Sequence, residues 1–415
     1  NRALQEDQPS MAYYGQRIRL EPVFKVAEGL NFSMRIDAME RVWGQFPVAS
    51  ETNPAGIGAL NTRNLMAEQN VQFRRGWMDF ISPIGMFVIG YRADGEWGTT
   101  FGDTGSEGPM VVYLLPLSKE FAFVAGYEQL NEGRLGDLNG YGPGFVDSDG
   151  ARWFVAGRYA RPNLEIGALA MYVRVANLRP GWVGPLDLGM KMLDTYWGGV
   201  YFKSTIGPLY IEAEYENWWG DFIKWDNLAN AKALLGAATT DIDLESQQIY
   251  LMAKLNMGPA YIGAQYAYSS GDDAGTADTM EGYPSPGNTH WQPCLILFED
   301  WTNRWSGNLG SAGQTTHLFA NVHFYQLFGG FNPTPKLGIK AGLAYAEADE
   351  KPAAAWIDDE YGTEFDLTVS YKIYDNLEYM IGFGYLWAGD YYKGTSSTFK
   401  IDDDYLVMHK LTLTF

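Results

Sequence analysis

Apolar and polar side chains alternate along most of the chain, in runs of about ten to thirteen residues, roughly twice the usual strand length of soluble proteins. In the last run, Tyr405, Leu411, Leu413 and Phe415 share one parity, and Lys410 shares the other parity with two threonines. A repeat of two residues places successive side chains on opposite faces of a β-strand. The pattern therefore predicts an all-β chain whose strands each have an apolar and a polar face.

Short turns pair these strands into hairpins. Several turns carry dipeptides that are typical of hairpins, namely Glu28-Gly29, Pro162-Asn163, Gly207-Pro208, Gly258-Pro259 and Asp375-Asn376. Longer loops rich in Asp, Gly and Asn separate the hairpins, and the unit recurs about eight times. This order predicts one domain over residues 1–415, an antiparallel up-and-down sheet with tight turns at one rim and long loops at the other.

The alternation fits two architectures. In a soluble sandwich the apolar faces meet in a core, whereas in a membrane barrel they face lipid and the polar faces line a lumen. Strand length and the alternation of short turns with long loops favour the barrel. So does the clustering of aromatic residues near strand ends, where interfacial girdles lie: Trp43, Trp97, Trp153, Trp197, Trp218, Trp219, Trp387, Tyr391 and Tyr392.

Composition narrows the choice further. The net charge of −20 argues against a nucleic-acid partner, whose phosphates would be repelled. No run of 18 apolar residues predicts a membrane-spanning helix. The single cysteine, Cys294, excludes a disulfide framework within one chain.

The closing strand resembles the last strand of Gram-negative outer-membrane β-barrels, in which a terminal aromatic residue and alternating apolar residues form the assembly signal. Here those residues are Phe415, Leu413, Leu411 and Tyr405. Together with the hairpins, nearly the whole chain resembles an outer-membrane porin. The resemblance implies a transmembrane β-barrel with short periplasmic turns and long extracellular loops. It also implies export with removal of a signal peptide, contact with outer-membrane lipid and lipopolysaccharide, and assembly as a homotrimer.

The strand number that the sequence indicates conflicts with the even numbers of known bacterial barrels. About seventeen strands are counted, although single-chain bacterial barrels have even numbers. We expect 16–18 strands, with 18 favoured if a further strand precedes the first hairpin and 16 as the second choice.

The polar parity of the strands carries the residues expected to line the lumen. The basic set is Arg17, Arg19, Lys25, Arg35, Arg74, Arg92, Arg152, Arg158 and Arg174. The acidic set is Glu212, Glu214, Glu216, Glu364 and Asp366. Opposite charges on facing walls would create a transverse field that favours polar solutes. The alternative is that these charges pair with neighbours on adjacent strands and only keep the lumen wet. Near Arg74 and Arg75 the parity slips, which predicts a β-bulge.

Two loops are candidates for the interior. The hairpin from Gln72 to Trp97 resembles the one that precedes the inward-folded constriction loop of diffusion porins, although the loop that follows it to Gly108 has only about a dozen residues. The loop from Gly271 to Gly313 carries the apolar run Cys294–Phe298. This loop enters the pore as a constriction or plug, packs on a neighbouring subunit, or caps other loops. Cys294 itself is expected to be a small buried apolar residue.

No catalytic or metal-ligand motif stands out around the four histidines, His290, His317, His323 and His409. We therefore expect neither an enzyme nor a cofactor nor a metal site. The acidic runs at 358–360 and 402–404 are read as solvated charge, with bound calcium as the alternative. The favoured function is passive diffusion of small hydrophilic solutes and ions. A channel selective for sugars or organic acids is the second hypothesis, and a structural or adhesion barrel is the third.

Overall fold

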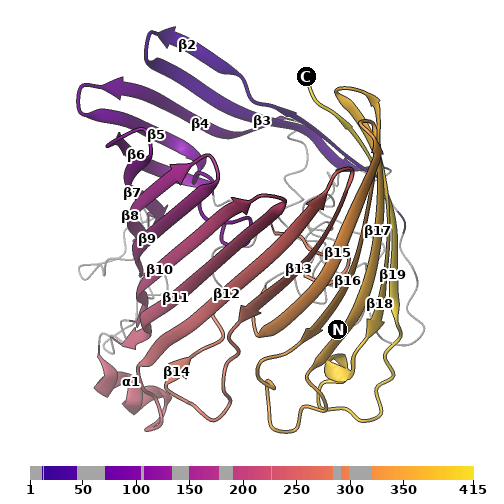
Figure 1. Cartoon of the computed structure of the whole chain (residues 1–415). Helices are drawn as coiled ribbons and strands as arrows, with labels where there is room; N and C mark the ends of the chain where they lie inside the picture. Colours follow the sequence, from indigo (N-terminus) through magenta and orange to yellow (C-terminus); the bar gives the residue numbers. More distant parts are fainter. Residues whose placement is uncertain are drawn as a thin grey trace.

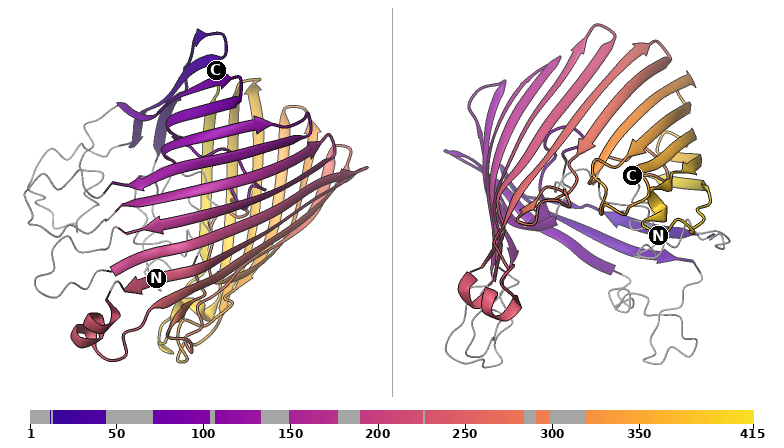
Figure 2. Two further views of the ribbon diagram at one scale, coloured as in Figure 1. Left: turned by 90° about the vertical axis from the view of Figure 1, so that its left-hand side faces the viewer. Right: turned by 90° about the horizontal axis from the view of Figure 1, so that it is seen from below.

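One sheet accounts for almost the whole structure, and its strands form a curved wall around an interior (Figures 1 and 2). The computed structural model describes residues 12, 14–43, 71–103, 107–132, 149–176, 190–225, 227–283, 291–298 and 319–415. Its strands are β1 (Gly15–Leu20), β2 (Val23–Ala27), β3 (Leu30–Val42), β4 (Val71–Ser82), β5 (Gly85–Ala93), β6 (Glu107–Pro116), β7 (Phe121–Asn131), β8 (Gly150–Arg161), β9 (Leu164–Val175), β10 (Met190–Ile206), β11 (Leu209–Trp225), β12 (Ile242–Met257), β13 (Ala260–Ser269), β14 (Thr279–Met280), β15 (Val322–Thr334), β16 (Leu337–Glu347), β17 (Glu360–Tyr374), β18 (Leu377–Ala388) and β19 (Asp404–Leu413).

Each strand of the wall pairs antiparallel with the next one along the chain. Strands β1 and β2 both pair with β3, so they form one strand that is interrupted at Pro22, which has no N–H to donate. The two-residue β14 pairs parallel with β12 and lies outside the up-and-down order. The described wall therefore has seventeen strands, in agreement with the predicted 16–18. Residues 1–11, where an eighteenth strand could begin, lie outside the described residues.

The two rims differ as predicted. Hairpin turns with positive-φ glycines, such as Gly29, Gly207 and Gly258 at φ of 75°, 60° and 67°, close the upper rim in Figure 1, which also holds the C-terminus. We call this the short-turn rim. The long-loop rim lies below and carries α1 (Leu228–Leu235) and the 3₁₀ helix η2 (Asp390–Lys393). No helix among the described residues is long and apolar enough to cross a membrane.

The wall has an apolar outer face and a polar inner face. Leu411 and Leu413 on β19 are 61% and 58% exposed, whereas Glu214 on β11 is 3% exposed. Exposed Leu251, Leu327 and other large apolar residues cover the outer face on neighbouring strands. A soluble sandwich would bury these side chains in its core, so the arrangement is that of a barrel whose outer face meets hydrocarbon. The predicted fold class is confirmed.

Aromatic girdles follow both rims of the outer face. Near the long-loop rim, ring contacts with centroid distances of 5.1–5.9 Å connect Tyr127, Trp153, Tyr172, Tyr196 and Trp219 across five strands. A second row near the short-turn rim contains Phe80, Phe87 and Tyr113. Such rows mark the membrane–water interfaces of a barrel.

Three of the tryptophans assigned to the girdles from the sequence lie elsewhere. Trp197 and Trp218 are buried in an apolar cluster on the inner face, and Trp97 contacts Tyr201 there. Their positions near strand ends are correct, but closeness to a rim does not determine which face a side chain occupies.

The two edges of the wall meet between β1 and β19. Here the rings of Tyr14 and His409 lie 5.4 Å apart, and Arg17 is close enough to Lys410 to interact with its charge. No described residue of β19 pairs with β1 or β2, so the described ladder of hydrogen bonds is open at this seam.

The predicted bulge on β4 is confirmed. Arg35 faces Arg75 and the next residue, Ile36, faces Phe73, so Arg74 is the additional residue. The bulge brings Arg74 and Arg75 together beside Glu107, at 3.6 and 2.7 Å.

Candidate functional site

Two chain segments leave the wall and fold into the interior of the barrel. The first inserted segment, residues 94–103, follows β5. The second inserted segment, residues 291–298, belongs to the long loop between β13 and β15. Each ends against a carboxylate on the inner face of a distant strand, and together they narrow the lumen.

The first inserted segment is anchored on Glu214. The backbone N–H of Thr99 and its hydroxyl donate hydrogen bonds to Glu214 Oε2 at 2.8 and 2.6 Å, and the N–H of Gly102 donates at 3.3 Å. Glu214 lies on β11, six strand pairings from β5 around the wall. The segment therefore reaches across the lumen, so a loop of only about a dozen residues is long enough to fold inward here.

Glycine is required where this segment meets the carboxylate. A Cβ at Gly98 would lie 2.1 Å from Glu214 Oε1, and one at Gly102 would lie 2.3 Å from the same atom. Gly98 also has a positive φ of 74°. The backbone approaches the carboxylate closely enough to donate only because no side chain intervenes.

The second inserted segment is anchored on Glu364. The backbone N–H groups of Leu295 and Ile296 donate to Glu364 Oε1 at 3.0 and 2.7 Å, and that of Leu297 donates to Oε2 at 2.6 Å. Glu364 is fully buried on β17. The described part of the loop 271–313 thus enters the interior. Of the three predicted arrangements for this loop, entry into the pore is the one that this part adopts.

The inserted segments meet inside the barrel. Phe101 stacks on Tyr250 at 5.0 Å and makes edge contacts with Trp291 at 5.2 Å and Phe319 at 5.4 Å. These rings belong to a buried cluster that also includes Leu297. Apolar packing between segments from opposite sides of the lumen rigidifies the constriction.

A row of polar side chains connects the two anchor regions along the wall. Both Tyr210 and Tyr250 place their hydroxyls on Glu212, at 2.8 and 3.1 Å from its oxygens. The hydroxyl of Tyr250 is also 3.0 Å from Gln265 Oε1, whose amide nitrogen donates to Gln326 Oε1 at 2.6 Å. Gln326 in turn donates to the carbonyl of Pro293 at 2.8 Å.

The basic wall is largely paired with acids on nearby strands. Arg19 bonds Asp37 at 2.8 Å, and the buried Arg35 contacts both Asp37 and Glu107. This is the pairing alternative considered from the sequence, and it reduces the net field that these arginines can produce.

The same holds further round the wall, where Arg152 bonds Glu128 and lies 3.3 Å from Asp94, and Arg158 bonds Glu165. Burial raises the pKa of Asp94 to about 6, and the positive charge of Arg152 opposes this shift.

Other predicted lining residues have diverse positions. Arg17 and Lys25 have partly or fully exposed side chains, and Arg92 Nε donates to the carbonyl of Ala93. Arg74 is the additional residue of the bulge on β4, and its half-exposed side chain lies 3.6 Å from Glu107. Among the acids, Glu212, Glu214, Glu216, Glu364 and Asp366 are all buried on the inner face. They therefore contact protein more than they contact open channel.

Arg174 is a correction. It shares the parity of exposed Ile166 and of Tyr172 on β9, while the intervening Val173 packs in the lumen cluster. Its cross-strand neighbour is Asp194, to which the hydroxyl of Tyr172 also donates. Arg174 therefore lies on the outer face, not in the pore. At the rim, where headgroups and water replace hydrocarbon, polarity no longer identifies the inner face.

Several interior residues were missed from the sequence. Glu107, Glu128 and Glu165 are the partners of predicted arginines, and the direct cross-strand pair Glu128–Arg152 could have been found by aligning the hairpins. Thr99 has no comparable signal, because its contact with Glu214 exists only once the curved wall has formed. An apolar patch of Val88, Met110 and Val112 on the inner face was missed because it shares its parity with charged residues.

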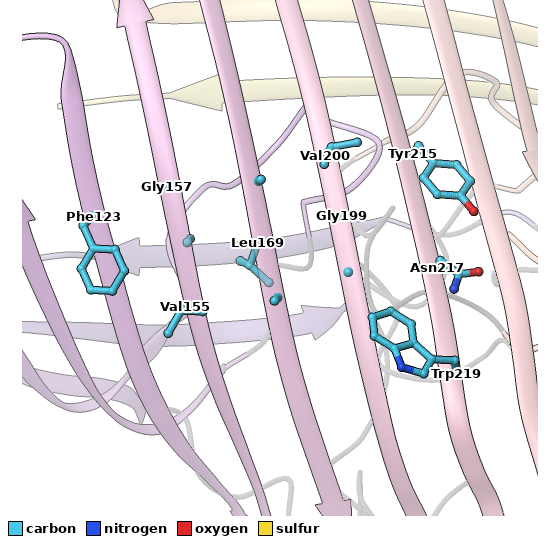
Figure 3. A pocket seen from close by; sticks show the side chains of 13 residues that line it. Phe123, Val155, Gly157, Leu169, Gly199, Val200, Tyr215, Asn217 and Trp219 are labelled. Carbon is cyan, nitrogen blue, oxygen red and sulfur yellow. The ribbon is translucent and has the colours of Figure 1, made fainter.

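A hollow of about 540 Å³ lies on the outer face across β7–β11 (Figure 3). Small residues, among them Gly157 and Gly198, line it together with larger ones such as Phe123, Val200 and Trp219. This hollow faces the lipid side and is separate from the lumen.

No protein-family model matches the chain, and no curated protein matches its sequence. Its fold is similar to that of a BenF-like porin from Pseudomonas fluorescens Pf-5, with a TM-score of 0.52 and 11% identity over 99% of this chain and 95% of that chain. For OccAB2 of Acinetobacter baumannii the TM-score is 0.52 and the sequence identity 13%, over 96% of this chain and 92% of that chain. For OccK11 (OpdR) of Pseudomonas aeruginosa the TM-score is 0.50 and the sequence identity 10%, over 97% of this chain and 91% of that chain. The chain therefore has the fold of Gram-negative outer-membrane porins, and the resemblance of its closing strand is confirmed at the level of fold.

Proposed function

We propose that the chain is an outer-membrane porin, a water-filled channel for passive diffusion of small hydrophilic solutes and ions. The observation that carries this proposal is the pair of inserted segments, each anchored by backbone N–H groups on an inward-facing carboxylate, Glu214 or Glu364. A barrel used only for its surface loops has no need of a constriction built across its interior. A porin does need one, since the narrowest section sets which solutes pass.

Single-channel recording in a planar bilayer tests this proposal. We expect steady, reproducible conductance steps from purified, folded protein, and swelling of liposomes in solutions of small sugars. Folded protein that inserts without conductance, checked by its heat-modifiable mobility on a gel, would favour the structural or adhesion barrel.

The second candidate is a channel selective for sugars or organic acids. Its support is the chemistry of the lumen, where the apolar patch around Val88 and Met110 lies on the same side of the wall as Arg92 and Arg152. An apolar surface beside guanidinium groups suits solutes with both an apolar body and a carboxylate. Saturable transport, with competition by one organic acid, would favour this candidate over general diffusion.

We propose no catalytic activity. His323 lies on the outer face, where its ring nitrogens contact Tyr266 and Asp349 at 2.9 Å, and His409 is also on the outer face. His290 and His317 lie outside the described residues. Purified protein should therefore leave phospholipid intact in detergent.

Location in the outer membrane, with lipid and lipopolysaccharide around the girdles, follows from the proposed function. Assembly as a homotrimer stays a prediction of the family resemblance. The outer hollow offers one place where a second wall could approach closely, because Gly157 and Gly198 have no side chains. Native mass measurement in detergent distinguishes a monomer from a trimer.

A further inference from the structure

Three potential metal ligands converge where the second inserted segment meets β17. Atoms of Cys294 (Sγ), Glu364 and Asp366 (one carboxylate oxygen each) all lie within 4.8 Å of one another. In the part of the chain that the structure describes, no other group of three His, Cys, Asp or Glu side chains meets this criterion. The acidic runs at 358–360 and 402–404 form no such group there.

Asp366 supplies the observation that points to a ligand. Its side chain is 7% exposed, and neither of its carboxylate oxygens makes a well-formed hydrogen bond, although the N–H of Leu295 and the thiol of Cys294 lie beside it. Its neighbour Glu364, two residues away on the same face, is fully buried and already receives three backbone N–H groups. Two buried carboxylates side by side, the second of them with only weak donors, are unfavourable unless a cation or a proton compensates their charge.

The surroundings hold the ligands close together. A Cβ at position 384 would lie 2.9 Å from Asp366 Oδ1 and 3.2 Å from Leu295 Cβ, so Gly384 lets the second inserted segment pack directly against the wall at Asp366. Gln326 Nε2 lies 3.8 Å from Cys294 Sγ and donates to the carbonyl of the preceding Pro293 at 2.8 Å. A donor that orients a ligand from behind is typical of metal sites.

We propose that Cys294, Glu364 and Asp366 bind a borderline-soft divalent cation of the Zn²⁺ type, which fixes the second inserted segment to the wall. One sulfur and two carboxylate oxygens suit Zn²⁺, whereas Ca²⁺ and Mg²⁺ prefer oxygen alone. In a tetrahedral site, ligand atoms are roughly 3.4–3.6 Å apart. The set therefore has to contract by little more than about 1 Å, which a segment held by backbone hydrogen bonds can accommodate. The proposal does not depend on channel activity.

Cobalt titration tests this site, because Co²⁺ occupies zinc sites and shows a sulfur-to-metal charge-transfer band in the near ultraviolet. Full-length folded protein in detergent is first stripped with a chelator and then titrated with Co²⁺, both after folding and during refolding. We expect about one Co²⁺ per chain with the charge-transfer band, displaced by Zn²⁺. The band should vanish in Cys294→Ser, and binding should weaken at least tenfold in Asp366→Asn.

The matched control is Asp358→Asn, which removes an exposed acid from a loop and should leave the titration unchanged. A second measurement needs no variant. Since Cys294 is the single thiol, its alkylation in the wild type should slow about tenfold or more when Zn²⁺ is added.

Three results would overturn the proposal. One is Co²⁺ binding without the sulfur band, and another is equal binding by Asp366→Asn and the wild type. The third is no Co²⁺ binding by the wild type either after folding or during refolding. A higher unfolding temperature in Asp366→Asn would then show that Glu364 and Asp366 share a proton instead.

Discussion

Thr99 donates both its backbone N–H and its hydroxyl to one oxygen of Glu214, at 2.8 and 2.6 Å, although 115 positions separate the two residues. A buried carboxylate that receives several donors is a strong anchor, since each hydrogen bond to a charged group contributes about 1.5–3 kcal/mol. This contact fixes the first inserted segment across the lumen, as the contacts with Glu364 fix the second.

Removing the first anchor should widen the channel. In Glu214→Ala the segment 94–103 loses its three donated hydrogen bonds, so we expect larger and noisier single-channel conductance. Glu214→Gln keeps an acceptor but loses the charge and should give an intermediate effect. Planar-bilayer recording measures both.

Glu212→Ala is the matched control for this change. Glu212 lies on the same strand and face but bonds Tyr210 and Tyr250 rather than the segment. Equal conductance in Glu214→Ala and the wild type would show that the anchor does not limit ion flow.

Removing the second anchor should expose Cys294. In metal-stripped Glu364→Ala, the N–H groups of Leu295, Ile296 and Leu297 lose their acceptor, so the second inserted segment should open more often. We expect alkylation of Cys294, which is 3% exposed in the structure, to accelerate at least tenfold. Glu378→Ala, on the inner face of the next strand, serves as control, and an unchanged rate in Glu364→Ala would contradict the role of the anchor.

A methyl group at Gly102 should act against the first anchor from the other side. Its Cβ would lie 2.3 Å from Glu214 Oε1, so Gly102→Ala should destabilise the barrel by about 1–3 kcal/mol. Gly76→Ala meets nothing within 4 Å and should change stability by no more than about 0.5 kcal/mol. Urea unfolding of both variants in the same lipid compares them. Equal midpoints would mean that the carboxylate moves aside without cost.

Ion selectivity should change with pH near 6. Burial raises the pKa of Asp94 to about 6, so this carboxyl is mostly ionised at pH 8 and mostly protonated at pH 5. Protonation removes one negative charge beside Arg152, with Glu128 and Asp103 also nearby, and so favours anions as the pH falls. Reversal potentials in a salt gradient should shift accordingly across this range.

In Asp94→Asn the carboxyl is absent at every pH, so the part of the shift centred near 6 should disappear. If the variant keeps the whole shift, the titrating group is another one.

The lining residues illustrate how far sequence reasoning reaches. Glu214 and Glu364 were correctly placed on the inward parity, because period-two alternation is a local property of each strand. The sequence predicts that both side chains line the open channel, since nothing near either residue in the sequence indicates which loop will cover it. Arg174 was misplaced for a related reason, as polarity marks the inner face only within the hydrocarbon region and not at its rim.

The sequence by itself determined the class of the fold, the order of the hairpins, the bulge at Arg74 and the outward face of the closing strand through Phe415. All of these features depend on residues that are close in the sequence or in the next hairpin, so alternation and turn residues are sufficient to predict them. Only the tertiary structure decided that Thr99 meets Glu214 and that Cys294 lies with Asp366. Each contact joins an inserted segment to a strand far from it around the wall, and the curvature of the wall brings the two together, which no local pattern encodes.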